Sequence, residues 1–442
     1  MEREELKRTA IEAIESSKDE LIDIGRHFMA NPETGFREEK TSAYLKGILE
    51  NCGLTVRDKI AMTGLKARAS GRKHEVNVAV MGEMDALLMP THAGSDPVTG
   101  AFHGCGHHAQ LTTIIGVCFG LVRSGLMKEL DGDLTFIGVP AEEVIESAYR
   151  RSLIDEGKLH FVSGKQEFIY LGEFDDVDMV LCSHIMGQIT APHAWAGHSW
   201  NGVIHKTVRY IGKSAHAGLA PERGINALEA ALCGMNNINA MRESFPERDS
   251  VRVHYIITKG GSSPNIVPDD IRIEGGVRAA TVEAMFKVND RVNRAFRLGA
   301  EAVGAGIEID DSAGYYLPCH QSEPLGEVYL RNACDILGSQ DVENVFGQHR
   351  GSSTDCGDVA SLIPLLHPYF GGAAGAPHGA DFDIVNEEAA YVYPAKIAAA
   401  TVIDLLYDGA AKAKEIKAGF VPAFDSKEAY LACFDKIQPE NS

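Results

Sequence analysis

Apolar residues recur at helical spacing near the start of the chain. The residues of the repeating face are Leu6, Ala10 and Ile14 before Ser16-Ser17, and Leu21, Ile24 and Phe28 after it. Because spacings of three and four residues place side chains on one side of a helix, the pattern predicts that the chain opens with an amphipathic helix whose pattern resumes after Ser16-Ser17. Asn31-Pro32 predicts where this helix ends.

Three apolar runs further along the chain have the composition of strands buried on both faces. They cover residues 76–81, 134–139 and 179–183. A polar residue follows each run: Asp85 the first, Glu142 and Glu143 the second, and His184 the third. Since strand ends gather at one edge of an open α/β sheet, the pattern predicts an α/β domain in which these side chains converge.

From about residue 201 the pattern changes to alternating apolar and polar positions. Residues 207–211 and 271–274 alternate in this way, as strands with one solvated face do, and helical stripes lie at 225–238 and 282–296. This order of elements predicts a small α+β domain over residues 200–312. A chain of 442 residues exceeds one hydrophobic core, so we expect the larger domain to be formed by 1–199 and 313–442.

The charge of the chain excludes several classes of partner. It has 42 basic and 62 acidic residues, and a formal charge of -20 repels nucleic acid and anionic membrane surfaces. The first eight residues are mostly charged, and no stretch approaches the roughly 18 apolar residues of a membrane span. Nine singly scattered cysteines do not form a disulfide framework. We therefore expect a cytoplasmic protein.

The stretch His103-Gly104-Cys105-Gly106-His107-His108 carries the first sign of chemistry. Cys105 and His107 offer a thiolate and an imidazole, which zinc, manganese or cobalt accept as ligands. Glu142 and Glu143 meet a second requirement, because one carboxylate of an adjacent pair can bind metal while the other takes a proton from an attacking water. Together these residues predict a metal-dependent hydrolytic site.

Two other classes of protein fit part of this pattern. A metal-independent cysteine hydrolase would use Cys105 as nucleophile and His107 as base. Residues two apart across a glycine rarely form the aligned hydrogen bond that such a pair needs, and Glu142 and Glu143 would have no role. A catalytically inactive metal-binding relative would be expected to lose the base first, yet Glu142 is present.

Several short motifs occur in the order of a known family. They are Pro32-Glu33-Thr34-Gly35, Met84-Asp85-Ala86-Leu87, His103-Gly104-Cys105-Gly106-His107, Pro140-Ala141-Glu142-Glu143, Gly212-Lys213-Ser214-Ala215-His216-Ala217-Gly218 and Gly260-Gly261-Ser262-Ser263-Pro264-Asn265. The chain resembles the dinuclear metallo-amidohydrolases and metallopeptidases that include aminobenzoyl-glutamate hydrolase, auxin-conjugate hydrolases and aminoacylase-like carboxypeptidases. The resemblance runs from the first helix to about residue 395. His108 and Gln110 depart from it, standing where many relatives have aspartate and histidine.

The resemblance implies a fold and an activity. The fold is a zinc-peptidase-like catalytic domain, with a mixed sheet flanked by helices, and an inserted ferredoxin-like domain that serves as lid and dimerisation domain. The activity is hydrolysis of an amide bond in an N-acyl or N-aroyl amino acid or a dipeptide-like small molecule. The cofactors would be two divalent metal ions, zinc or manganese in preference to cobalt or nickel, and the assembly a homodimer.

The resemblance also implies individual roles. The implied metal ligands are Cys105, His107, Glu143, His184 and His378. Glu142 is implied as the general base, His216 as a group that reaches a site across the dimer, and Asn265 and Arg278 as groups that hold a substrate carboxylate. Residues 147–172 are too long for a plain crossover, so we expect them to form an insertion near the site.

Overall fold

The computed structural model describes residues 1–437 and divides the chain into two compact units. The first unit comprises 1–198, 320–348 and 359–427, and of the described residues the second comprises 199–319, 349–358 and 428–437. The first boundary lies one residue before the predicted one. The second unit extends seven residues beyond the predicted end at 312 because its last strand continues to Tyr316.

The first unit is built on a six-stranded mixed sheet, as the predicted fold class requires. Its strands, in spatial order, are β1 (Val56–Ile60), β2 (Gly64–Ala69), β6 (Asp133–Val139), β3 (Asn77–Glu83), β7 (Met179–Leu181) and β17 (Leu365–Leu366). β6, β3, β7 and β17 are parallel, whereas β1 and β2 are antiparallel. Every residue of β3, β6 and β7 is buried, which explains their continuous apolar runs.

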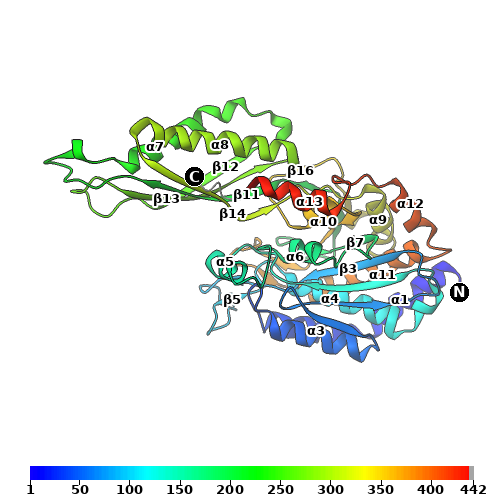
Figure 1. The fold of residues 1–442 in the computed structure, drawn as a ribbon. Helices are drawn as coiled ribbons and strands as arrows, with labels where there is room; N and C mark the ends of the chain where they lie inside the picture. Colours follow the sequence, from blue (N-terminus) through cyan, green and yellow to red (C-terminus); the bar gives the residue numbers. More distant parts are fainter. Residues whose placement is uncertain (438–442) are drawn as a thin grey trace. The chain divides into compact units, whose positions relative to one another are not determined.

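Helices pack on this sheet and supply most of its core. α4 (His107–Cys118) packs directly on β3. α11 (Tyr393–Leu406) packs against α4, and α1 (Arg3–Ser16) packs against α11 (Figure 1). The other longer helices of the unit are α2 (Lys18–Met29), α3 (Glu39–Asn51) and α9 (Glu323–Leu337). The predicted N-terminal helix is present, but it is divided at Ser17 into α1 and α2.

One stretch differs from the expectation that nothing in the chain resembles a membrane span. Glu388–Leu406 is long and apolar enough to cross a membrane by length and composition. In the structure 94% of it is buried inside the protein, as η7 (Glu388–Val392) and α11 pack against α4 and α9. Its apolar composition is that of a core helix.

Short elements complete the first unit. A second sheet contains β15 (Val342–Asn344), β9 (Ala194–Ala196), β18 (Tyr369–Phe370) and β8 (His184–Ile185). The hairpins are β4 (Leu87–Leu88) with β5 (Ala101–Phe102) and β19 (Ala373–Ala374) with β20 (Asp383–Ile384). The predicted insertion contains two helices, α5 (Ser147–Asp155) and α6 (Gly164–Tyr170).

The second unit is a four-stranded antiparallel sheet covered on one face by two helices (Figure 1). Its elements in chain order are β11 (Gly202–Ile211), α7 (Ala227–Met241), β12 (Arg252–Lys259), β13 (Asp270–Ala279), α8 (Val282–Val303) and β14 (Gly306–Tyr316). The spatial order β12-β13-β11-β14 is ferredoxin-like, as predicted. The alternating pattern over 207–211 and 271–274 arises because only one face of the sheet packs on the helices.

A buried ion pair ties the sheet of the second unit to α8. The Lys206 ammonium donates to Asp311 Oδ1 at 2.8 Å and to Asn289 and Asn293 at 2.6 Å each. Both asparagines donate in turn to Asp311 Oδ2 at 2.7 Å. All four side chains are buried, so each charge is satisfied only by the others.

Asp311→Ala is expected to destabilise the second unit by about 3 to 5 kcal/mol, because it leaves the Lys206 ammonium buried without its charged partner. Hydrogen exchange of the β11 and α8 amides in the full-length protein measures the loss. Arg209→Ala, which removes a solvent-exposed pair with Asp270 in the same sheet, should alter exchange far less. Equal effects of the two variants would contradict a stabilising role for the buried network.

Candidate active site

The carboxyl edge of the parallel strands carries the predicted polar residues. β3 leads to Asp85, β6 to Glu142 and Glu143, and His184 follows β7 at the start of β8. β3 is parallel to both of its neighbours, so these three segments end side by side.

Cys105 and His107 lie at the start of α4, and their side chains reach the same edge of the sheet. Gly106 between them has φ +77°, and a side chain there would stand 2.1 Å from Ile185. Only glycine combines this backbone conformation with so close an approach. The backbone at Gly106 thus delivers the thiol and the imidazole to the strand ends.

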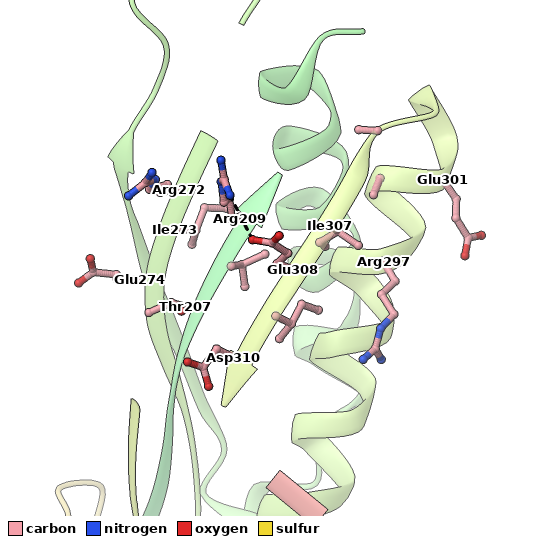
Figure 2. Close-up of a pocket in the computed structure, with 14 residues that line it drawn as sticks. Thr207, Arg209, Arg272, Ile273, Glu274, Arg297, Glu301, Ile307, Glu308 and Asp310 are labelled. Carbon is pink, nitrogen blue, oxygen red and sulfur yellow. Dashed lines mark hydrogen bonds and ion pairs between the residues drawn. The ribbon is translucent and has the colours of Figure 1, made fainter. Parts of the chain in front are cut away.

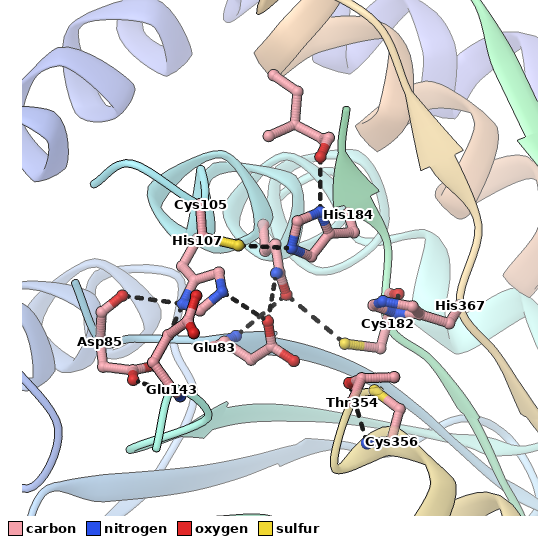
Figure 3. A network of polar contacts seen from close by, with 12 residues as sticks. Glu83, Asp85, Cys105, His107, Glu143, Cys182, His184, Thr354, Cys356 and His367 are labelled. Carbon is pink, nitrogen blue, oxygen red and sulfur yellow. Dashed lines mark hydrogen bonds and ion pairs between the residues drawn. The ribbon is translucent and has the colours of Figure 1, made fainter. Parts of the chain in front are cut away.

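The structure brings together all six residues that the sequence assigned to the metal ions and to the base. Three sets of donor atoms each lie within 4.8 Å of one another: Cys105, His107 and His184; Cys105, Glu143 and His378; and His107, Glu142 and Glu143. Figure 3 shows four of the six, Cys105, His107, Glu143 and His184, around one point.

Backbone carbonyls fix two of the imidazoles. His107 Nδ1 lies 2.9 Å from the carbonyl oxygen of Asp85, and His184 Nδ1 lies 2.6 Å from that of Ile185. Because a carbonyl oxygen only accepts, both Nδ1 atoms must carry hydrogen. The Nε2 atom of a neutral ring then holds the lone pair, and His184 Nε2 lies 3.5 Å from Cys105 Sγ.

His378 reaches the cluster from a strained loop. Its φ is +62°, and its N–H donates to the carbonyl of Gly104 at 2.9 Å. Its Nε2 lies 3.3 Å from Cys105 Sγ and 3.0 Å from Glu143 Oε1. His367, the competing histidine of this region, instead donates from Nδ1 to the carbonyl of Cys182 at 2.6 Å.

Buried charge sets the protonation of these groups. Burial raises the pKa of the Cys105 thiol, and Glu143 and Glu142 raise it further, to well above its usual range. Burial would lower the pKa of His107, but the carboxylates of Glu83 and Asp85 outweigh it and raise that pKa to about 9. Burial and the adjacent His367 lower the pKa of His184 to about 3. At neutral pH the protein by itself therefore holds protons on Cys105 and His107.

The donor set fits a divalent cation. Glu143 Oε1 and His107 Nε2 are buried and make no well-formed hydrogen bond to any residue within 1–437, although charged neighbours stand at 3.0 and 3.1 Å. Thiolate, imidazole and carboxylate are the ligands that zinc and related ions take. A cation would also compensate the buried carboxylates.

Two charged residues that the sequence reading missed lie directly beneath the cluster. Glu83, the last residue of β3, is buried with its carboxylate 3.1 Å from His107 Nε2. The Lys165 ammonium pairs with it at 2.5 Å and is fully buried. Burial would raise the pKa of Glu83, but Lys165 and His107 hold it far below its usual range. A glutamate at the end of an apolar strand is unusual, because an ionised side chain is rarely buried without a partner. This position in the sequence could have identified Glu83 as a buried, paired residue.

The two departures from the family pattern do not enter the cluster. Gln110 donates to Glu83 Oε2 at 2.6 Å and accepts the N–H of Glu83 at 3.2 Å, so it orients that carboxylate. His108 Nε2 lies 3.1 Å from the hydroxyl of Tyr391. Both side chains are buried and act on neighbours of the donor set.

The other three predicted residues belong to the second unit. His216 Nδ1 accepts from the N–H groups of Gly218 and Leu219 at 3.2 and 3.1 Å, so the neutral ring carries its hydrogen on Nε2. The N–H of Ala217 donates to the carbonyl of Asn265 at 2.9 Å, which places these two segments side by side.

Arg278 lies at the far end of the same sheet from Asn265. Asn265 precedes β13 and Arg278 stands near the end of that strand, where its guanidinium donates to Ser353 Oγ at 2.7 Å. At about 3.3 Å per residue, the strand separates them by more than about 20 Å. The Asn265 and Arg278 of one chain therefore cannot hold one small carboxylate together.

The second unit also has a surface cavity of about 840 Å³ that is lined by residues of β11, β13, β14 and α8 (Figure 2). Its charged lining contains both signs: Arg209, Arg272, Arg297, Glu274, Glu301, Glu308 and Asp310. Arg209 pairs with Glu308 at 3.4 Å and with Asp270 at 2.8 Å. Among the residues of this lining we find no donor set like that of Cys105 and its neighbours, so the first unit holds the candidate active site.

Comparisons with known proteins show what the chain is similar to. The model of the M20 peptidase dimerisation domain matches residues 201–302. The chain is 27% identical to mouse Xaa-Arg dipeptidase over 430 residues, covering 92% of this chain and 90% of that one. It is 28% identical to a p-aminobenzoyl-glutamate hydrolase subunit of Escherichia coli over 327 residues, covering 71% of this chain and 63% of that one.

A solved structure shows the same fold. It is that of a dinuclear metal-binding peptidase of the M20 family from Bacillus subtilis, with a TM-score of 0.64 and 20% identity, covering 89% of this chain and 99% of that one. The motifs, the dimerisation domain and the named relatives converge: the chain contains an M20 peptidase dimerisation domain and is similar along most of its length to amidohydrolases and peptidases.

Proposed function

We propose that this protein hydrolyses the amide bond of an N-acyl or N-aroyl amino acid, or of a dipeptide-like small molecule, with the help of two divalent metal ions. The observation that carries the proposal is the convergence of Cys105, His107, Glu143, His184 and His378 beside Glu142. The relatives named as a dipeptidase and an aminobenzoyl-glutamate hydrolase support the substrate class.

The five ligand side chains would hold the metal ions. Three nitrogen donors, one sulfur and one carboxylate suit zinc or manganese, with cobalt and nickel as alternatives. When bound, such ions lower the pKa of water and polarise an amide carbonyl, which is otherwise a poor electrophile.

The chain's own groups then handle the proton and the developing charge. The Glu142 carboxylate, buried beside Glu143 and His107, accepts the proton of the attacking water and returns it to the leaving nitrogen. His216, whose neutral ring carries its hydrogen on Nε2, is the donor for the oxyanion. Asn265 and Arg278 bind the substrate carboxylate, for which a guanidinium fork is well shaped.

The geometry argues against a metal-independent cysteine hydrolase. His107 Nδ1 is engaged by Asp85, and Cys105 Sγ contacts His184 and His378 instead of His107. Burial and the adjacent carboxylates raise the pKa of Cys105, whereas a nucleophilic thiol needs a lowered pKa. The presence of Glu142 likewise favours an active enzyme over an inactive metal-binding relative.

We further propose a homodimer formed through the second unit. β12 is an edge strand with Ile256 and Ile257 exposed, and Leu232 of α7 is exposed as well. An exposed apolar edge strand is a template for pairing with a second copy. The wide separation of Asn265 and Arg278 supports the same assembly, because one substrate could meet both only if they came from different chains. The nine free cysteines suit the reducing cytoplasm that we propose as its location.

Glu142→Gln is expected to retain the metal ions and to lose turnover by about 100-fold to 10,000-fold, since the amide cannot accept the proton. The measurement is kcat on N-acyl amino acids, aminobenzoyl-glutamate and dipeptides, with metal content determined on the same sample. Wild-type turnover by a fully loaded Glu142→Gln protein would rule out Glu142 as the base.

Metal binding to the metal-free protein is expected to release about two protons at pH 7. His107, with a pKa of about 9, and Cys105, with a pKa far above neutral, are both protonated and must lose their protons to bind. Affinity should therefore rise as pH increases from 7 toward 9. Calorimetric titration with Zn²⁺ in buffers of different ionisation enthalpy counts the protons.

Cys105→Ala provides the control for this count, because it should release about one proton fewer. Proton-neutral binding by the unaltered protein would contradict the assignment of both ligands.

Mixing the inactive variants Glu142→Gln and His216→Ala is expected to restore up to about a quarter of wild-type activity if His216 acts across the dimer. Half of the exchanged dimers are then hybrids, and each hybrid has one intact site. Native mass spectrometry confirms the exchange of chains. Mixing Glu142→Gln with the double variant Glu142→Gln/His216→Ala is the control, because no such hybrid contains a base. Exchange without recovered activity would refute the action in trans.

A further inference from the structure

The loop that carries Glu142 and Glu143 is irregular and needs support from outside its own sequence. Ala141 adopts φ +56°, a region that non-glycine residues enter at a cost in free energy. Its N–H donates to Oε1 of the buried Glu38 carboxyl group at 2.9 Å, and the N–H of Glu143 donates to Asp85 Oδ2 at 2.9 Å. These bonds satisfy the N–H groups and leave the carbonyl groups of the loop to be satisfied elsewhere.

Arg150 of α5 adds side-chain donors to those carbonyls, which also accept from backbone N–H groups: that of Ala141 from Gly164 at 3.4 Å, and that of Glu143 from Ile145 at 2.8 Å. Its Nη1 donates to the carbonyl of Ala141 at 3.2 Å and to that of Val162 at 2.6 Å, and its Nη2 donates to the carbonyl of Glu143. The side chain is 1% exposed, and no carboxylate of residues 1–437 lies within ion-pair distance of it. The buried guanidinium thus donates hydrogen bonds to main-chain carbonyls on both sides of Glu142.

The packing around Arg150 is shaped to admit it. A side chain at Gly35 would stand 2.5 Å from Arg150 Nη2 and 2.8 Å from Ala141 Cβ, so the glycine leaves room for the guanidinium against the loop. The neighbouring Tyr149 donates its hydroxyl to the carbonyl of Phe36 at 3.3 Å, and Arg37 stacks over the Tyr149 ring at 3.8 Å. These contacts of Tyr149 hold α5 next to the loop that carries Glu142 and Glu143.

The other end of the insertion is anchored to α6. The buried carboxylate of Glu167 accepts from the N–H groups of His160 and Phe161 at 2.8 and 2.9 Å and contacts His160 Nδ1 at 3.0 Å. The His160 ring stacks on Tyr170 at 3.8 Å. Arg150 donates to the carbonyl of Val162 in the same segment. The two ends of the insertion are therefore joined to each other, and through Arg150 they are joined to the loop of Glu142 and Glu143.

We propose that Arg150 is a positioning residue for Glu142 and Glu143, and that the insertion over 147–172 is the brace that holds its guanidinium against their loop. The inference rests on the proposed function, since it assigns Arg150 a part in the same site. Arg150 does not touch substrate; it acts by fixing the main chain from which the base and one metal ligand project. A planar fork with five donors can join three carbonyls, whereas an ammonium on a flexible stem cannot hold them in one geometry.

The test compares Arg150→Lys with Glu167→Gln and with a structural control in the full-length protein. Arg150→Lys keeps a positive charge but loses the fork, and we expect kcat to fall about 100-fold with KM unchanged, because a displacement of about 1 Å has that effect on a reacting group. Metal affinity should fall about 10-fold, as it does when the groups that orient a ligand are removed. The absorption spectrum of the Co²⁺-loaded variant should change as Glu143 shifts.

Glu167→Gln loosens the far end of the brace without touching the loop and should lower kcat in the same direction by a smaller factor. This milder variant decides the question if Arg150→Lys does not fold. The control is Lys7→Met, which removes another buried cation of the first unit, paired with Asp404 at 2.8 Å. It should lower thermal stability yet leave kcat, metal affinity and the Co²⁺ spectrum unchanged.

Three results separate this inference from the proposed function. Folded Arg150→Lys and Glu167→Gln proteins with wild-type kcat, metal affinity and Co²⁺ spectrum would overturn the positioning role while leaving the hydrolase intact. A wild-type protein that binds metal but hydrolyses no amide would overturn the proposed function, and the affinity and spectrum of the variants would still decide the role of Arg150. Loss of kcat by Lys7→Met in parallel with Arg150→Lys would reduce the effect to stability and also overturn the inference.

Discussion

The site depends on keeping several negative charges buried at one edge of a sheet. Glu83, Asp85 and Glu142 are nearly or fully withdrawn from water, and Glu38 is completely buried beside them. Carboxylates survive in such a place only if cations or hydrogen-bond donors compensate them. Lys165 and His107 do this for Glu83, and Arg150 and His107 lower the pKa of Asp85 against the effect of burial. Glu38 is compensated least: burial and Asp85 raise its pKa to about 8, so it is neutral at pH 7.

This constraint explains features that look unrelated along the chain. Lys165 at the start of α6 and Arg150 in α5 bring positive charge to strand ends that carry buried carboxylates. Gly35 and Gly164 leave room for the loop that carries the base, because a side chain at Gly164 would stand 1.8 Å from the carbonyl of Pro140. The insertion, the two glycines and the apolar strands together place a cluster of carboxylate, imidazole and thiol groups at one edge of the sheet, where it suits divalent cations.

The buried strands and most of the candidate site could be predicted, because burial and strand formation leave patterns among residues that are close in sequence. Fully apolar runs identify β3, β6 and β7, and the residue after each run points to the site because parallel strands end at one edge. The motifs then supplied Cys105, His107 and His378, which the structure brings to the same point. The strands β1 and β12 carried weaker signals, because both lie at sheet edges and their burial depends on neighbours distant in sequence.

By itself the sequence determined the fold class, the inserted unit and the residues of the donor set, because each rests on a period, a composition or a motif that is local in the chain. Only the tertiary structure decided which groups compensate them. Lys165 lies 82 residues from Glu83, and Arg150 sits in a segment with no recognisable motif. Such pairings depend on where the chain folds back, and no local pattern encodes them. The tautomers of His107, His184 and His216 were likewise fixed by backbone carbonyls and amides whose positions exist only in the folded protein.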